Sequence, residues 1–124
     1  MFVCVENANR SQMAEAFARM HGGDHVDAYS AGSRPSGQVN SRAIEFMKEI
    51  GYDLEKHQSK ALADLPDFEF DVAVTMGCGD ACPLVRAKRR LEWNIPDPKE
   101  LPRDRFRTVR DSIEEKVKAL LAEL

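Results

Sequence analysis

Strand-like and helical segments alternate along this chain, and the alternation limits the fold more than any other feature of the sequence. The apolar start MFV is followed by a loop and then by SQMAEAFARM, whose apolar residues have helical spacing. A strand is predicted from about His25 to Ala31, and FDVAVTM at 70–76 is the most strand-like run in the chain. Because strands that alternate with helices form βαβ units, the sequence predicts a mainly parallel sheet covered by helices.

The remaining segments follow the same alternation. The run NSRAIEFMKEIGY predicts a helix with Asn40 or Ser41 as its N-cap and Gly51 as its stop. The others are a short helix at 60–65, a loop with a helical turn at 77–90, a weaker fourth strand at 90–95 and a long amphipathic helix from about Pro102 to Leu124. In parallel sheets of this kind, ligands bind outside the carboxyl ends of the strands.

The composition predicts one domain at 1–124. The chain has 124 residues, of which 43% are hydrophobic, so it is long enough to bury a single core. The net charge is -3, and no apolar run is long enough to span a bilayer or to act as a secretory signal. We therefore expect a cytoplasmic protein without a membrane partner. The acidic balance, with only a short KRR run at 88–90, argues against a nucleic-acid partner.

The chain has three cysteines, Cys4, Cys78 and Cys82. An odd count in a cytoplasmic chain argues against a structural disulfide framework, and each cysteine taken alone is most simply a small buried residue. Their positions carry more information than their number. Cys4 lies at the end of one predicted strand and Cys78 lies just beyond another, where a parallel sheet binds ligands.

The stretch CVENANRS at 4–11 joins a strand to the start of a helix. Such a loop offers unpaired N–H groups and the positive end of the helix dipole, so it binds tetrahedral oxyanions and lowers the pKa of a thiol. We therefore expect Cys4 to be largely ionised at neutral pH and Arg10 to hold two oxygens of the anion with its planar fork. The predicted oxyanion-binding residues are Glu6, Asn7, Ala8, Asn9, Arg10 and Ser11, with Asn7 and Ser11 also bracing the loop.

The sequence resembles a known family at these residues. FVCVENANRSQMAEAF is similar to the phosphate loop of the low-molecular-weight protein tyrosine phosphatase superfamily, and especially of its arsenate reductase branch. Further matches are YSAGSRP, NSRAIEFMKEIGYDLEKHQSK, DVAVTMGCGDACP, WNIPDP and FRTVRDSI, so the resemblance covers nearly the whole chain. It implies a single-domain, three-layer α/β fold in which a four-stranded parallel sheet is flanked by helices.

The resemblance also implies roles for individual residues. Cys4 would be the nucleophile, Arg10 the oxyanion clamp and Asp97 the general acid, although an Asp-Pro pair taken alone is most simply a turn. Cys78 and Cys82 would pass the oxidation on as a disulfide relay, in an order that their short spacing leaves open. The resemblance implies no bound cofactor and no metal, and an external thiol reductant, for which we expect thioredoxin.

Two features of the sequence favour reduction of arsenate over hydrolysis of phosphoesters. The phosphotyrosine phosphatases of the superfamily have aromatic residues after the Asp-Pro pair, whereas here Pro98 is followed by Lys99 and Glu100. Many of them also have a second cysteine before the loop arginine, where this chain has Asn9. We therefore predict an arsenate reductase. A phosphatase is the alternative, and a non-catalytic zinc or redox module is a more distant one, because the three histidines are scattered.

Overall fold

The computed structural model describes residues 1–67, 69–77 and 85–124, and within them four parallel strands form one sheet in the order β2-β1-β3-β4. The strands are β1 (Phe2–Cys4), β2 (Ser30–Gly32), β3 (Phe70–Thr75) and β4 (Ala87–Glu92). The helices are α1 (Arg10–Gly22), α2 (Ser41–Lys48) and α3 (Arg103–Glu123), with short 3₁₀ turns at Gly23–His25, Leu54–Lys56 and Leu62–Asp64. The predicted α/β fold with a four-stranded parallel sheet is confirmed.

The strand order brings the ends of separate strands to one edge of the sheet. From β1 the chain moves to β2 on one side, and the next strand, β3, then pairs with β1 on the other side. Ligands in parallel sheets bind at such a reversal of strand order, outside the carboxyl ends of the strands. Cys4 ends β1 there, and the segments that follow β3 and β4 leave the sheet at the same edge.

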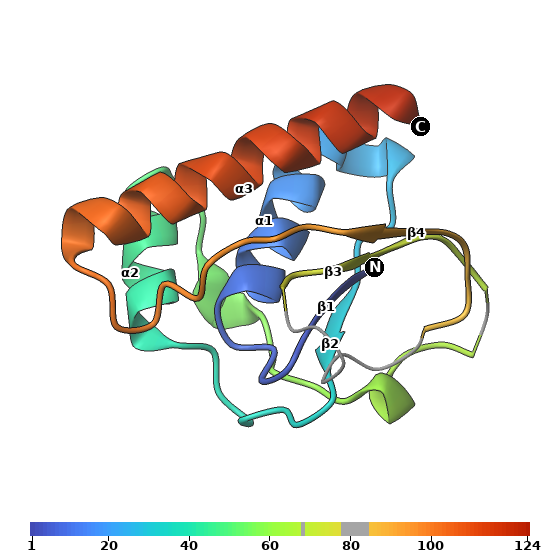
Figure 1. The fold of residues 1–124 in the computed structure, drawn as a ribbon, viewed down its shortest axis with the longest axis horizontal. Helices are drawn as coiled ribbons and strands as arrows, with labels where there is room; N and C mark the ends of the chain where they lie inside the picture. The colour runs from blue at the N-terminus through green and yellow to red at the C-terminus, as the bar shows by residue number, and fades with distance from the viewer. Residues whose placement is uncertain (68, 78–84) are drawn as a thin grey trace.

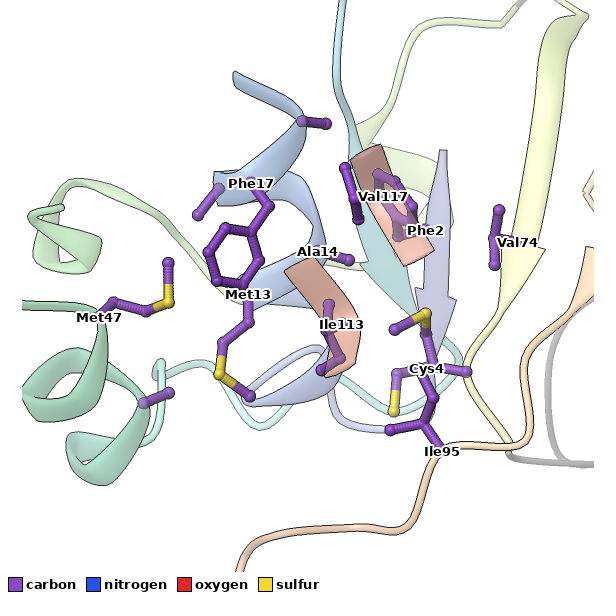
Figure 2. Close-up of a cluster of buried hydrophobic side chains, with 14 of the residues drawn as sticks. Phe2, Cys4, Met13, Ala14, Phe17, Met47, Val74, Ile95, Ile113 and Val117 are labelled. Carbon is purple, nitrogen blue, oxygen red and sulfur yellow. The ribbon is translucent and has the colours of Figure 1, made fainter. Parts of the chain in front are cut away.

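Helices α1 and α3 cover one face of the sheet, α2 packs against both of them, and α3 crosses α1 in Figure 1. Phe2 and Val74 of the strands belong to one buried cluster with Phe17 of α1 and Ile113 of α3, and Figure 2 labels all four. Cys4 lies beside Ile95 at the edge of this cluster, so the reactive end of β1 is part of the core.

The opposite face of the sheet carries a smaller buried cluster. Val3 and Ala73 belong to it, and each alternates along its strand with residues of the first cluster. Phe70, at the start of β3, also belongs to this smaller cluster. Within the part of the chain that the structure describes, Leu62 and Leu65 cover this face, and no α-helix contributes to the cluster. The layers on the two sides of the sheet are therefore unequal.

Helices α2 and α3 follow their predicted patterns. Asn40 is the N-cap of α2, and its side-chain oxygen accepts a hydrogen bond from the backbone N–H of Arg42 at 2.9 Å. Helix α3 begins directly after Pro102, which cannot donate a backbone hydrogen bond and is therefore well placed at a helix start. Both boundaries follow from local chemistry that the sequence makes visible.

Several other elements differ from their predictions. The strand predicted at 25–31 is wrong in extent, because residues 23–25 form a 3₁₀ turn and only Ser30–Gly32 pair with β1. The helix predicted at 60–65 is a single 3₁₀ turn, preceded by Ala61, which bridges to Gly32. Strand β4 begins at Ala87, earlier than predicted, and the prediction for 77–90 falls partly on residues 78–84, outside the described residues. Pairing with a neighbouring strand fixes these boundaries, and such pairing cannot be predicted from the local sequence.

Candidate active site

The loop between β1 and α1 turns its peptide carbonyls outward, toward the segment that follows β2. Three of them accept hydrogen bonds from that segment: Val5 O from Arg34 N at 2.8 Å, Glu6 O from Ser36 N at 3.1 Å, and Ala8 O from Asn40 N at 3.0 Å. In a trans peptide the C=O and the next N–H point in opposite directions. The N–H groups of Glu6, Asn7 and Asn9 are therefore turned toward the inside of the loop, where they can bind an anion.

Gly32 at the end of β2 allows this close contact. A Cβ atom at residue 32 would lie 2.4 Å from the carbonyl oxygen of Val5 and 2.9 Å from that of Cys4. Contacts this short with backbone atoms do not occur in proteins, so any side chain here would push the loop away from β2. The need for glycine at residue 32 comes from this contact with a distant part of the chain, so the local sequence does not reveal it.

Asn7 holds the centre of the loop in a left-handed backbone conformation, with φ at 51°. Asparagine tolerates this conformation better than most residues. Its side chain is fixed on both sides: Nδ2 donates to Ser11 Oγ at 2.9 Å, and Oδ1 accepts from Gln12 Nε2 at 2.8 Å and from Lys60 N at 3.0 Å. Asn7 and Ser11 thus brace the loop, as predicted, and neither lines the cavity described below.

Arg10 crosses beneath the loop and is anchored by backbone oxygens from two other strand ends. Its Nη1 donates to the carbonyl of Met76 at 2.7 Å and to that of Ile95 at 2.8 Å. Its Nε is buried and has no hydrogen-bond partner among the described residues. Because Nη1 is used for anchoring, the edge formed by Nε and Nη2 remains for a bidentate bond to an oxyanion. Gly77, with φ at +90°, leaves room for this arginine, since a Cβ there would lie 3.3 Å from Nη1.

The Cys4 thiol is almost completely buried, at 6% exposure. Burial raises the pKa of Cys4 above its ordinary value of 9.0, and the positive charge of Arg10 and a hydrogen bond from the Val5 backbone oppose this increase. The prediction that Cys4 is largely ionised at neutral pH is therefore wrong for this structure. The loop supplies the expected stabilising groups, but desolvation of the sulfur outweighs them.

Helix α1 begins without a side-chain cap from its own N-cap residue. Asn9 is its N-cap, yet the Asn9 side chain makes no capping hydrogen bond, and the first turn contains no acidic residue. The exposed N–H groups of a helix start and its dipole both favour a negative charge at this point. The local geometry therefore suits a bound oxyanion, as the sequence predicted.

A cavity of about 260 Å³ opens above these groups. Its lining combines the loop with the segment after β4: Cys4, Val5, Glu6, Ala8, Asn9, Arg10, Asp97 and Lys99. Asp97 lies at the mouth, and its Oδ1 accepts a hydrogen bond from the backbone N–H of Lys99 at 3.0 Å. The structure thus brings the predicted nucleophile, clamp and acid to one cavity, although they come from sequence positions far apart. Cys78 and Cys82 lie outside the described residues.

A buried polar network supports Asn7 from behind. Gln12 donates to Asn7, and His57 Nδ1 lies 3.0 Å from Gln12 Oε1 and 3.4 Å from a Glu15 carboxylate oxygen. The other ring nitrogen of His57 lies 2.6 Å from the Tyr52 hydroxyl. Burial lowers the pKa of His57 below its ordinary value of 6.5, so the neutral form is favoured. The network joins residues that are far apart in the sequence, so local sequence patterns do not reveal it.

The described residues contain neither a metal-binding cluster nor a membrane-spanning helix. In 1–67, 69–77 and 85–124, no group of three or more histidine, cysteine, aspartate or glutamate side chains could hold a metal ion. The zinc alternative rested on Cys78 and Cys82, which are not described. No helix in the described part of the chain is long and apolar enough to cross a membrane.

Comparison with known proteins identifies the family. The family model for low molecular weight phosphotyrosine protein phosphatase matches residues 1–124. "Arsenate reductase 2" of Staphylococcus epidermidis is 39% identical over 116 residues, which are 90% of this chain and 87% of that protein. "Glutaredoxin arsenate reductase" of Synechocystis sp. is 34% identical over 100% of this chain and 96% of its own. The chain therefore belongs to the low molecular weight phosphotyrosine protein phosphatase family.

A solved structure places the chain more narrowly. It is described as "An arsenate reductase in the phosphate binding state", is 35% identical, and superposes with a TM-score of 0.89 over 99% of this chain and 95% of its own. Together with the two relatives, this similarity places the chain in the arsenate reductase branch of the family, as the sequence motifs predicted.

Proposed function

We propose that this protein is an arsenate reductase that converts arsenate to arsenite with Cys4 as the attacking thiol. The observation that carries the proposal is the pairing of Cys4 with Arg10 in one anion-binding loop. The sulfur lies at the floor of the cavity, and the buried Nε of Arg10, which has no partner among the described residues, provides a donor for the oxyanion. The arsenate reductases among its relatives support this substrate.

In the first step, the Cys4 sulfur attacks arsenic and one As–O bond breaks. Because burial raises the pKa of Cys4, the thiol reaches the anion with its proton. Arsenate that enters as the dianion accepts this proton from the thiol. The transfer gives a thiolate beside monoanionic arsenate, and the total number of protons in the site does not change. Asp97 then protonates the departing oxygen, which leaves as water. The product is a Cys4–arsenate adduct held by Arg10 and the loop N–H groups.

In the second step, a second thiol receives the oxidation. We propose that the Cys78 thiolate attacks the Cys4 sulfur, so that an S–S bond forms and the S–As bond breaks. The electron pair of the S–As bond stays on arsenic, which leaves as arsenite. Cys82 then attacks Cys78, releases Cys4 and completes a Cys78–Cys82 disulfide. Two thiols are oxidised for each arsenate reduced, so the electrons balance.

An external dithiol must reduce this disulfide before the next turnover. We propose thioredoxin as the reductant, and glutaredoxin is the competing choice because one relative is named a glutaredoxin arsenate reductase. A relay of free thiols operates in a reducing compartment, which supports a cytoplasmic location. No bound cofactor takes part in the proposed steps.

Measuring two activities on the same protein tests the proposal. Arsenite formation is followed with thioredoxin or with glutaredoxin and glutathione, beside hydrolysis of an aryl phosphate by the same preparation. We expect arsenite over many turnovers with one of these reductants, and only slow aryl phosphate hydrolysis. Fast aryl phosphate hydrolysis without any arsenite would favour the phosphatase alternative, which needs Cys4 but no second thiol.

A further inference from the structure

An ion pair spans the mouth of the Cys4 cavity. Glu6 belongs to the loop after β1, Lys99 belongs to the segment after β4, and both line the cavity. Lys99 Nζ lies 3.8 Å from Glu6 Oε2. Because β3 lies between β1 and β4 in the sheet, this pair crosses above the carboxyl end of β3. Arg10 makes the same crossing at the floor, through its bond to Ile95.

The two backbones of the ion pair are fixed, whereas the two side chains are free to move. The carbonyl of Glu6 accepts from Ser59 Oγ at 2.8 Å, and the carbonyl of Lys99 accepts from Arg42 Nη1 at 2.9 Å. The side chains themselves are half-exposed, at 48% for Glu6 and 49% for Lys99. An exposed ion pair of this kind contributes little stability, so it can separate and re-form without disturbing the loop.

We propose that Glu6 and Lys99 form a charged gate that makes the Cys4 cavity selective for small inorganic oxyanions over aryl phosphoesters. This inference rests on the proposed function and specifies its substrate class. A compact dianion entering the cavity replaces Glu6 as the partner of Lys99, so the ammonium group keeps an anionic partner throughout. An aromatic ring cannot form an ion pair with the Glu6 carboxylate or with the Lys99 ammonium group. An aryl ester must therefore hold these two side chains apart and remove water from both charged groups.

Single-charge variants test the electrostatic half of the gate. Inorganic phosphate is titrated calorimetrically into reduced wild type, Lys99→Met and Glu6→Gln. We expect Lys99→Met to weaken phosphate binding about three- to tenfold and Glu6→Gln to tighten it about two- to threefold, from the effect of one nearby charge on a dianion. Lys118→Met on α3 and Glu100→Gln are the matched controls, since both residues are exposed and neither lines the cavity. Equal affinities in all five proteins would contradict the gate.

A double variant tests selectivity. Inorganic phosphate and phenylphosphonate, an aryl ligand that cannot be hydrolysed, are compared in wild type and in Glu6→Ala/Lys99→Ala. We expect the ratio of the two affinities to shift toward phenylphosphonate by about tenfold, with phosphate affinity close to that of wild type because the floor is intact. An unchanged ratio of the two affinities would overturn the proposal. Loss of phosphate binding in the double variant would also overturn it, because phosphate binding at the floor would then depend on Glu6 and Lys99.

These binding measurements also separate the gate from the proposed activity. Neither phosphate nor phenylphosphonate is reduced, so the two affinities do not depend on arsenite formation. A protein that shows the expected shift in affinity but forms no arsenite would keep the gate and lose the reductase assignment. A protein that forms arsenite with an unchanged affinity ratio would keep the assignment and lose the gate.

Discussion

The floor and the mouth of the Cys4 cavity are built in opposite ways. The floor consists of the buried residues Cys4 and Arg10, and Asn7, which is completely inaccessible at 0% exposure, braces the loop behind it. Hydrogen bonds to other parts of the chain fix the Asn7 and Arg10 side chains. The mouth consists of Glu6, Asp97 and Lys99, all partly or fully exposed, and one ion pair of 3.8 Å joins its two sides.

This difference separates two tasks. The floor must hold donors where charge develops during attack, which requires groups that do not reorganise. The mouth must admit the anion and release the product, which requires side chains that separate easily. A rigid floor therefore sets the chemistry available to any tetrahedral oxyanion, and the mouth sets which oxyanion arrives.

The largest effect is expected from Cys4→Ser, which removes the nucleophile and keeps the floor. Arsenite formation and aryl phosphate hydrolysis should both fall by about 10⁴-fold or more, because serine lacks the reactivity of the thiol. Phosphate affinity should stay within about threefold of wild type, since loop N–H groups and Arg10 do most of the binding. Activity assays and calorimetry check both results, and residual turnover near that of wild type would remove Cys4 from the mechanism.

Asp97→Asn changes the mouth and tests its role in proton transfer. Hydrolysis of an alkyl phosphate, whose leaving oxygen needs a proton, should slow by about 10²-fold, the usual contribution of a general acid. Hydrolysis of a nitrophenyl phosphate should slow much less, because its leaving group departs without protonation. The ratio of the two rates is the measurement. Equal losses with both substrates would show that Asp97 acts only as a turn residue.

Gly32→Ala is expected to displace the backbone of the loop at the floor of the cavity. The added Cβ would lie 2.4 Å from Val5 O, so the loop must shift, with a loss of about 1–3 kcal/mol in the free energy of unfolding. Phosphate affinity should fall at least about tenfold, because correctly placed N–H groups provide it.

Gly51→Ala is the control for Gly32→Ala. Residue 51 has φ at +88° and nothing within 4 Å of an added Cβ, so backbone strain should lower stability without touching the loop. Urea unfolding and phosphate calorimetry compare the two variants. If both lose phosphate affinity equally, general destabilisation and not loop geometry is responsible.

The smallest effect concerns the network behind the floor and its dependence on pH. Burial lowers the pKa of His57 in the folded protein, so the unfolded chain takes up the proton first as the pH falls below 6.5. His57 therefore makes the free energy of unfolding decrease as the pH falls from about 8 to about 5. In His57→Gln this part of the decrease should be absent. Urea unfolding across this pH range measures it, and parallel curves for the two proteins would contradict the assignment.

Much of the floor could be predicted from the sequence because its signals are local. CVENANRS joins a strand to a helix start, and the loop geometry, the place of Arg10 and the bracing by Asn7 and Ser11 all follow from that connection. The N-cap Asn40 is equally local. The family motifs added Asp97, which composition and spacing alone would have left as a turn.

The remaining features depend on contacts between distant residues. Gly32 is required by the approach of β2 to the loop, and His57 reaches Gln12 across 45 positions of sequence. The pKa of Cys4 rises because the sulfur is buried among core side chains, which a loop motif does not reveal. Burial and strand register depend on contacts between distant residues, so local sequence patterns predict them only in part.

A single-turnover experiment tests the central claim most directly. Fully reduced protein is mixed with excess arsenate in the absence of any external thiol, and arsenite and the cysteine pairing are then measured by mass spectrometry of unreduced peptides. We predict a burst of about one arsenite per chain together with a Cys78–Cys82 disulfide, because three thiols on one chain complete one reduction. No arsenite without an external thiol, with all three cysteines still reduced, would contradict the account.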